Sequence, residues 1–399
     1  MSRTSAQRIA RADDRFVAYE PLPRSRPRTA RSRRRTRSRP ALRIRRIAIL
    51  TFACLLAVVA ISFASAMSAP SNSPFGIRAV EWLRDNGAAW LVSDVESLYY
   101  GLRGPSTGGA ALKALPRVGA AAAAGAYAPP PIVPVIDPPL PGEGQWHGTG
   151  PLVRGTSPVL VTTFRPDPSY PRMLGGVAWI DPTRAWLQLY PGRYEPPGAA
   201  GTSATVPHSL RGGLLATFNS GFKLADNHGG FVAFGHVYAP LRDGQATLVR
   251  YRDGRADVVT WNGGPKPAPG VEFARQNLPL IVDGGRLNPN INDGPQWGAT
   301  LGNAVRVWRS GIGVDAHGGL LYAAADAQTA RSLAQILQRA GAVRAMELDI
   351  NSEWVTFNFY GGFDAAMPQK LLPGMTRSAV RYLTPDDRDF FAVYARSRP

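Results

Sequence analysis

Short, mostly apolar runs rich in β-forming residues, separated by turn-forming residues, fill most of the chain after Trp146. Such runs predict β-strands. The clearest are Pro158–Phe164, Gly176–Ile180, Ala185–Leu189, Gly213–Phe218, Phe231–Phe234 and Ala246–Tyr251. Hairpin turns are predicted at Asp243-Gly244, Asp253-Gly254 and Asn262-Gly263, because these dipeptides favour the tight turns that join paired strands. With one clear helical pattern near its end, residues 146–399 are predicted to form a sheet-rich α+β domain.

The helical pattern follows a predicted hairpin. Ile312–Asp315 and Leu320–Ala324 flank a glycine-containing turn, as expected for two paired strands. Apolar residues then recur at helical spacing, with Asp326 or Thr329 as the N-cap. Gly341 ends the predicted helix, because glycine commonly follows the last helical turn.

A further strand, Val343–Asn351, completes a terminal β-α-β unit with Leu320–Ala324, and we expect these two strands to be parallel neighbours. Side chains alternate between the two faces of a strand, so Glu347, Asp349 and Asn351 share one face. The two carboxylate-bearing residues are then roughly 6–7 Å apart at the backbone. This pair suits acid–base chemistry or cation binding, and a solvent-exposed strand edge is the alternative.

Arginine dominates the start of the chain. Residues 1–46 hold 16 Arg and three acidic residues, a net charge of +13 out of +18, so only +5 belongs to the rest of the chain. This composition predicts a disordered tail. A nucleic-acid-binding arm is the alternative, but the tail has only Phe16 and Tyr19 for stacking on bases. Attraction to anionic lipid headgroups is the simpler interpretation, and we expect no nucleic-acid partner.

An uncharged apolar segment of 21 residues, Ile47–Met67, follows the tail. A helix of that length, at ~1.5 Å per residue, spans roughly the ~30 Å hydrocarbon core of a membrane. Because Arg45 and Arg46 adjoin its N-terminal end, the positive-inside rule predicts a single-pass cell-membrane protein with a cytoplasmic N-terminus and an extracytoplasmic C-terminal domain. The alternative is a cleaved signal peptide with Ala64-Ser65-Ala66 as its cleavage site. The long basic leader favours the anchor.

Two further segments separate the apolar stretch from the predicted domain. Residues 75–101 show helical spacing that is broken at Asn86-Gly87, which predicts a juxtamembrane pair of short helices. Its aromatic residues, which suit a membrane interface or packing on the domain, are Trp82, Trp90, Tyr99 and Tyr100. Residues 103–145 are rich in Ala, Gly and Pro and predict a linker. The one cysteine, Cys54, lies in the apolar segment, so disulfides and thiol chemistry are excluded from the predicted domain.

Several motifs occur in the order found in the phosphodiester glycosidase family. Phe218-Asn219-Ser220-Gly221-Phe222 resembles that family's Asn-Gly-Gly-Phe-Phe-like element, and Leu278–Arg286 resembles a family hairpin. Arg309 precedes a Gly-x-Gly strand, as in the family. Leu348–Glu353 is similar to the family's closing Leu-Asp-Gly-Gly-Gly-Ser, although Ile350 and Asn351 stand where the family has glycine. The resemblance covers about residues 205–365.

This resemblance implies hydrolysis of sugar-1-phosphodiesters. Glycosidic cleavage generally uses two carboxyl groups, so Asp349 and Glu347 are the candidate catalytic pair. A phosphodiester also needs a cationic group, for which Arg309 is the candidate and Arg306 the alternative. The candidate substrate-binding residues are Asn219, Gly221, Arg309, Asn351 and Ser352.

The expected substrate is a carbohydrate or glycopolymer of the cell envelope or an exopolysaccharide. No cofactor or metal motif is predicted, although carboxylates and amides at the site suit a divalent cation such as calcium. The alternative function is a noncatalytic envelope glycan-binding module of the same fold, because the glycines that permit close backbone approach are replaced.

Overall fold

The computed structural model describes residues 39–88, 90–92, 107, 112–121, 127–199, 201–298 and 306–396. The Arg-rich tail before residue 39, the aromatic pair Tyr99 and Tyr100, and much of the predicted linker lie outside these residues. The chain divides into two compact units, Met1–Ala60 and Ile61–Pro399. Each is considered by itself below.

The long helix α1 (Arg39–Ser68) contains the predicted apolar segment. Its stretch Leu42–Ser68 is the one described helical segment that is long and apolar enough to cross a membrane, a character that signal sequences share. The short helix α2 (Phe75–Leu83) continues into the π-helical segment η1 (Arg84–Ala88). Gly87 has a φ of 82° there, so the helical run is interrupted at the predicted Asn86-Gly87 position.

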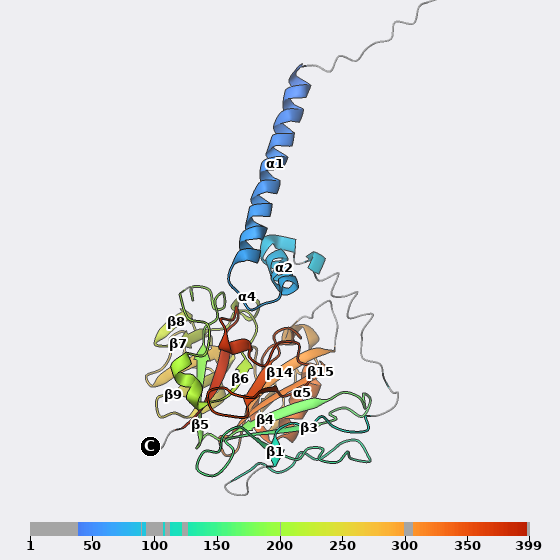
Figure 1. Ribbon diagram of the computed structural model, residues 1–399, viewed down its shortest axis with the longest axis vertical. Helices are drawn as coiled ribbons and strands as arrows, with labels where there is room; N and C mark the ends of the chain where they lie inside the picture. Colours follow the sequence, from blue (N-terminus) through green and yellow to red (C-terminus); the bar gives the residue numbers. More distant parts are fainter. Residues whose placement is uncertain are drawn as a thin grey trace, which may run out of the picture. The chain divides into compact units, whose positions relative to one another are not determined.

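Three sheets form the rest of the described second unit (Figure 1). The largest has the order β1 (Ala120–Ala121), β2 (His147–Thr149), β3 (Val159–Phe164), β4 (Gly175–Ile180), β15 (Leu320–Gln328), β14 (Val307–Asp315), β16 (Ala342–Glu347), β12 (Val282–Asp283) and β13 (Arg286–Leu287). The second has the order β10 (Ala256–Thr260), β9 (Ala246–Tyr251), β11 (Val271–Gln276), β7 (Phe231–Ala233) and β8 (His236–Ala239). The third has the order β18 (Pro368–Lys370), β17 (Phe357–Tyr360), β6 (Leu214–Asn219), β19 (Phe390–Ala395) and β5 (Ala185–Tyr190).

Helices are few beside these sheets. The α-helices of the domain are α4 (Leu224–Asn227) and α5 (Ala330–Arg339), and the 3₁₀ helices are η2 (His208–Gly213), η3 (Gly294–Trp297) and η5 (Arg381–Leu383). All six strands predicted from short apolar runs occur within one or two residues of the expected bounds, and the predicted α+β class is confirmed.

The large sheet has a different apolar partner on each face. Along β15, Leu320 and Tyr322 belong to the core shared with the other two sheets, whereas Leu321 and Ala323 belong to the cluster under α5. This alternation follows from the twofold repeat of a strand. Both faces are covered, which explains why β15 reads as an almost continuous apolar run.

Helix α5 begins and packs as its sequence predicts. Thr329 is the N-cap, and its side chain exchanges hydrogen bonds with Ser332 in a capping box. A side chain at Gly311 of β14 would meet Leu337 at 2.9 Å, so the glycine allows the helix to lie close to the sheet.

The β-α-β unit is present, but its strands are not neighbours. Strand β14 pairs antiparallel with both β15 and β16, so β15 and β16 are parallel and separated by β14. The expectation of parallel neighbours is therefore wrong. The crossover through α5 places β16 beyond the hairpin because the other edge of β15 is already paired with β4.

Of the three hairpin turns predicted from dipeptides, one joins paired strands and two do not. Asp253-Gly254 joins the paired strands β9 and β10 as a hairpin. The turns at Asp243-Gly244 and Asn262-Gly263 do not, because β9 lies between β10 and β11, and β8 pairs with β7 rather than with β9. A turn sequence sets the local bend, whereas the pairing of the flanking strands depends on the whole sheet.

Residues before 146 also belong to this body. Ile132 is 1% exposed, and Glu143 accepts hydrogen bonds from the backbone and guanidinium of Arg165. Both members of this ion pair are buried, and Arg165 also donates to the carbonyl oxygens of Ile136 and Pro138. The domain therefore extends upstream of residue 146 into the proline-rich segment.

A fragment that begins at residue 146 should be less stable than one that begins at residue 127. Removing Glu143 leaves the buried Arg165 without its carboxylate, which typically costs about 3–5 kcal/mol. We expect a lower midpoint in urea unfolding for the shorter fragment, and a partial loss for Glu143→Gln in the longer one. Equal midpoints for both fragments would contradict the extended boundary.

Candidate active site

The ends of several strands meet on one side of the domain. Strand β6 ends at Asn219, which lies opposite Phe390 at the start of β19. Strand β16 ends at Glu347, which lies opposite Gly311 in the middle of β14. Two backbone hydrogen bonds, from Ser310 N to Asp349 O and from Leu348 N to Ser310 O, extend this pairing past the end of β16. Polar residues at these ends are therefore gathered in one place.

Asn219 is the centre of this gathering. Its amide nitrogen donates to the Ser310 hydroxyl at 3.0 Å, and its amide oxygen accepts from the Tyr322 hydroxyl and from Thr356 N, each at 2.9 Å. The Ser310 hydroxyl in turn donates to the carbonyl oxygen of Asp349 at 3.0 Å. Asn219 is 3% exposed, so its side chain does not face solvent. Through Ser310 it positions the backbone at Asp349.

The Asp349 carboxylate is buried beyond the end of the strand. The predicted strand to Asn351 is too long, because β16 ends at Glu347 and the backbone then turns. One carboxylate oxygen of Asp349 accepts from Asn351 N at 2.9 Å, and the other accepts from the Arg388 guanidinium at 3.2 Å. Burial raises the pKa of Asp349, although the charge of Arg388 opposes this shift. At 4% exposure, it is not the solvated strand edge of the alternative interpretation.

Glu347 and Arg309 form a second buried pair. The Arg309 guanidinium bonds to one carboxylate oxygen of Glu347 and also donates to the carbonyl oxygens of Gln328 and Trp297. The other carboxylate oxygen of Glu347 has no hydrogen-bond partner among the described residues. Burial raises the pKa of Glu347, with the nearby Asp349 adding to the rise and Arg309 opposing it. Arg306, the alternative cation, pairs instead with Asp167 at 3.0 Å.

Arg388 connects Asp349 to a cavity of about 590 Å³. Besides the Asp349 carboxylate, its guanidinium donates to the carbonyl oxygen of Gly221 at 3.1 Å and lies 5.1 Å from the Trp354 ring centroid. Its Nε is buried without a hydrogen-bond partner in the described part of the chain. Arg388 lines the cavity, and a guanidinium suits an anionic ligand because it combines a positive charge with several N–H donors.

Among the described residues, six more charged side chains line this cavity: Arg78, Glu81, Asp85, Glu195, Lys223 and Asp387. Glu195 is 5% exposed, and burial together with the nearby Asp389 raises its pKa, while Arg275 and Arg388 oppose the rise. Lys223 also lines the cavity and forms an ion pair with Glu81 of α2. Although burial acts in the opposite direction, Lys223 and Arg388 hold the pKa of Glu81 below its ordinary value.

The remaining predicted site residues have different positions. Gly221 supplies the carbonyl group that Arg388 contacts, and a side chain on it would meet Asn277 at 3.1 Å. Asn351 accepts from Glu353 N within the turn after Asp349, and the Ser352 carbonyl accepts from the Thr376 hydroxyl. Neither Asn351 nor Ser352 lines the cavity. Within the described residues, no group of three or more His, Cys, Asp or Glu side chains is close enough to hold a metal ion.

Sequence reasoning missed Arg388, Glu195 and Lys223. Arg388 belongs to the charged run Asp386–Asp389, which directly precedes the buried strand β19. A run of charged residues next to a buried strand predicts buried charged side chains, and it could therefore have indicated a site. Glu195 and Lys223 lie in irregular segments, where no periodic pattern points to a site.

Comparison with known proteins gives one family match. Residues 209–349 match the family described as phosphodiester glycosidase. No curated protein matches the chain. The match begins after Glu195 and ends at Asp349, so Trp354 and Arg388 lie outside it.

Three solved structures match the chain at low sequence identity. The zebrafish N-acetylglucosamine-1-phosphodiester alpha-N-acetylglucosaminidase catalytic domain, auto-inhibited by its pro-peptide, is 16% identical over 64% of this chain and 88% of that chain, with a TM-score of 0.41. A hypothetical protein from Synechocystis is 14% identical over 62% and 64%, with a TM-score of 0.38. A protein described as exported, from Burkholderia pseudomallei, is 14% identical over 57% and 75%, with a TM-score of 0.35. The resemblance predicted from the sequence is confirmed by the match of residues 209–349 to the phosphodiester glycosidase model.

Proposed function

We propose that this chain is a membrane-anchored hydrolase that cleaves sugar-1-phosphodiester linkages in glycopolymers of the cell envelope or in exopolysaccharides. The observation that carries the proposal is the contact between the buried Asp349 carboxylate and the guanidinium of Arg388, a residue that lines the cavity. The family match supports the hydrolase class. The apolar helix and its flanking arginines support a single membrane span with an extracytoplasmic domain.

The phosphate of the substrate would bind at Arg388. Its guanidinium supplies a positive charge and N–H donors, and Lys223, which is paired with Glu81, lines the same cavity. Arginine and lysine together neutralise the charge that develops on a departing phosphate, which lowers the barrier to breaking the anomeric C–O bond. The Trp354 ring lies against the guanidinium and limits its movement.

Asp349 and Glu195 supply the two carboxyl groups that glycosidic hydrolysis generally uses. In the proposed reaction, water adds to the anomeric carbon and gives its proton to Asp349. The bond to the phosphate oxygen breaks, and the phosphomonoester leaves with the electron pair and takes a proton from Glu195. Glu347 remains with Arg309, so we assign this pair to positioning of the strand end beneath Asp349. This assignment replaces Glu347 with Glu195 as the second reacting carboxyl group.

A noncatalytic glycan-binding module is the second candidate, because Ile350 and Asn351 replace the family's glycines next to Asp349. Both candidates share the cavity and the cation, and they differ in turnover. Binding without release of sugar separates them.

Asp349→Asn should abolish hydrolysis while the protein stays folded. General base catalysis contributes about 10²–10⁴-fold to rate, so we expect a loss of that size in kcat for release of N-acetylglucosamine from UDP-N-acetylglucosamine or aryl sugar phosphodiesters. The full chain in detergent is used, and Asp226→Asn, at an exposed position, is the matched control. Sugar binding without release by the unaltered chain, with no effect of Asp349→Asn, would favour the binding module.

The pH profile tests the two carboxyl roles. Burial raises the pKa of both Asp349 and Glu195. As the base, Asp349 must be ionised, so activity should fall as pH drops through a value above the ordinary ~3.9 of Asp. As the acid, Glu195 must be protonated, so activity should fall again as pH rises through its own raised value. Glu195→Gln should remove this second fall together with most of the rate, whereas an unchanged profile would exclude Glu195 as the acid.

A further inference from the structure

A second pocket lies at the opposite ends of the strands that build the candidate active site. Strand β19 starts beside Arg388 and ends before Arg396, and β14 runs from the neighbourhood of Arg309 to the turn that carries His317. Arg396 and His317 line this pocket. Six to nine strand residues at ~3.3 Å each place it roughly 20–30 Å from the candidate active site.

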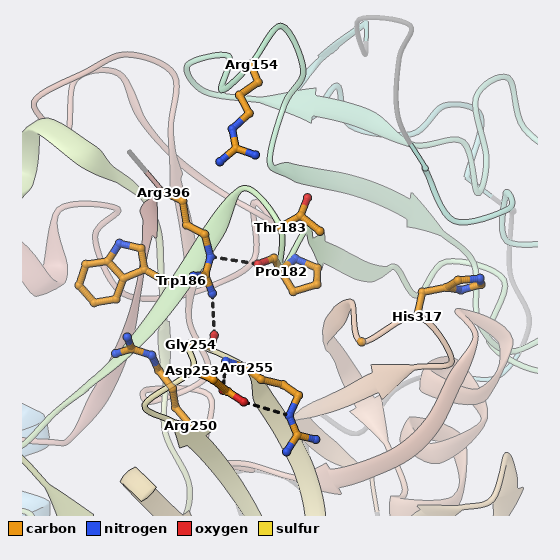
Figure 2. A pocket seen from close by; sticks show the side chains of 11 residues that line it. Arg154, Pro182, Thr183, Trp186, Arg250, Asp253, Gly254, Arg255, His317 and Arg396 are labelled. Atoms are coloured by element: carbon orange, nitrogen blue, oxygen red, sulfur yellow. Dashed lines mark hydrogen bonds and ion pairs between the residues drawn. The ribbon is translucent and has the colours of Figure 1, made fainter. Parts of the chain in front are cut away.

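Four arginines enter the pocket from four separate segments, as Figure 2 shows. They are Arg154 from the loop after β2, Arg250 from β9, Arg255 from the β9–β10 turn, and Arg396 after β19. The pocket has a volume of about 710 Å³, and Asp253 is the one carboxylate among the described residues that line it. Its lining is therefore strongly positive.

Arg396 is held in place without a carboxylate partner. Its Nε donates to the carbonyl oxygens of Pro182 and Ala185, each at 3.0 Å, and its NH2 donates to the carbonyl oxygen of Gly254 at 2.6 Å. Within the described residues, no ion pair to Arg396 occurs. Carbonyl groups fix the orientation of the guanidinium but leave its charge uncompensated.

The other arginines are only partly neutralised. Arg154 is exposed and makes no ion pair with the described residues, and Arg255 reaches Asp253 and Asp257 only at 4.0 and 3.7 Å. Arg250 pairs with Glu272 at 2.7 Å, but its Nε is buried without a partner in the described chain. Burial and the nearby charge of Arg396 lower the pKa of Arg250, which Glu272 opposes.

The environment of Trp186, the aromatic residue of the pocket, disfavours nucleic acids relative to other phosphate-bearing ligands. One ring neighbour of Trp186 is Tyr394, stacked at 4.6 Å, and another is the Arg250 guanidinium at 5.0 Å. A ring covered in this way holds Arg250 but offers no free platform for nucleic-acid bases, which bind single strands by stacking. Recognition here depends on charge and on the bidentate geometry of guanidinium groups, which matches phosphate.

We propose that this pocket binds phosphate groups of an anionic glycan, separately from the candidate active site. The pocket exceeds one phosphate group in size, and its arginines come from several segments, so a chain bearing more than one phosphate fits it better than a single ion. The proposal does not require catalysis. If the proposed function is also correct, the two sites hold distant phosphates of one glycopolymer.

The test measures binding of a synthetic oligosaccharide joined by phosphodiesters to the full-length protein in detergent. The double variant Arg154→Ala/Arg255→Ala removes the two most exposed arginines, which spares the contacts that hold Arg396. A lost charged hydrogen bond is worth about 1.5–3 kcal/mol, so we expect affinity to fall at least about tenfold for each arginine. Arg154→Lys/Arg255→Lys should recover part of this loss.

Controls separate the proposal from its competitors. Arg242→Ala/Arg331→Ala, at exposed positions outside the pocket, should bind like the unaltered chain. Asp349→Asn should keep this binding even if it abolishes hydrolysis. The binding test therefore remains valid even if the proposed function is wrong. Equal affinity in the Arg154/Arg255 double variant, or equal binding of the dephosphorylated oligosaccharide, would overturn the proposal. So would tighter binding, lost in the same variant, of an oligonucleotide or of phosphatidylglycerol vesicles.

Discussion

The hydrogen bonds of the Asn219 side chain join the parts of the domain on which the candidate site depends. One amide group contacts Ser310 of β14, Tyr322 of β15 and Thr356 before β17, while its own backbone ends β6. A buried amide must satisfy both its donors and its acceptor, so this arrangement holds only when all of these elements are in register. Ser310 then passes the constraint on to the backbone of Asp349.

Several buried ion pairs lie at the end of the domain that holds the candidate active site. Arg275 pairs with Asp389 at 2.8 Å, and Arg381 contacts both carboxylate oxygens of Asp386, at 2.6 and 2.9 Å. All four side chains are almost completely buried. Buried pairs rarely add net stability over apolar residues, because removing charges from water is costly. We therefore interpret the Arg275–Asp389 and Arg381–Asp386 pairs as a fixed electrostatic frame, which sets the charges near Arg388. The Nε of Arg388 itself has no hydrogen-bond partner among the described residues.

The same strands link this frame to the arginine-lined pocket at their other ends. Strand β19 carries the Asp386–Asp389 run before its first residue and Arg396 after its last. Acidic residues balance the arginines at the first end, whereas backbone carbonyl groups hold Arg396 at the second. Most charges at the first end are thus held in buried ion pairs, whereas at the second end Arg154 and Arg396 make no ion pair with the described residues.

Local order was readable from the sequence. Short apolar runs bounded by turn residues predicted the strands, and helical spacing after Asp326 or Thr329 predicted α5, because both patterns depend on residues close together in the chain. The order of several short motifs predicted the family resemblance. Asp349 and Asn219 could be selected in the same way, since both stand at strand ends. The neighbour of β16, the pairing of Arg309 with Glu347, and the approach of Glu195 and Arg388 to one cavity required the folded chain. The residues brought together in this way are up to 193 positions apart in the sequence, from Glu195 to Arg388. Local sequence periodicity cannot predict which of such distant residues become neighbours. Only the packing of three sheets decides which charges are left facing each other.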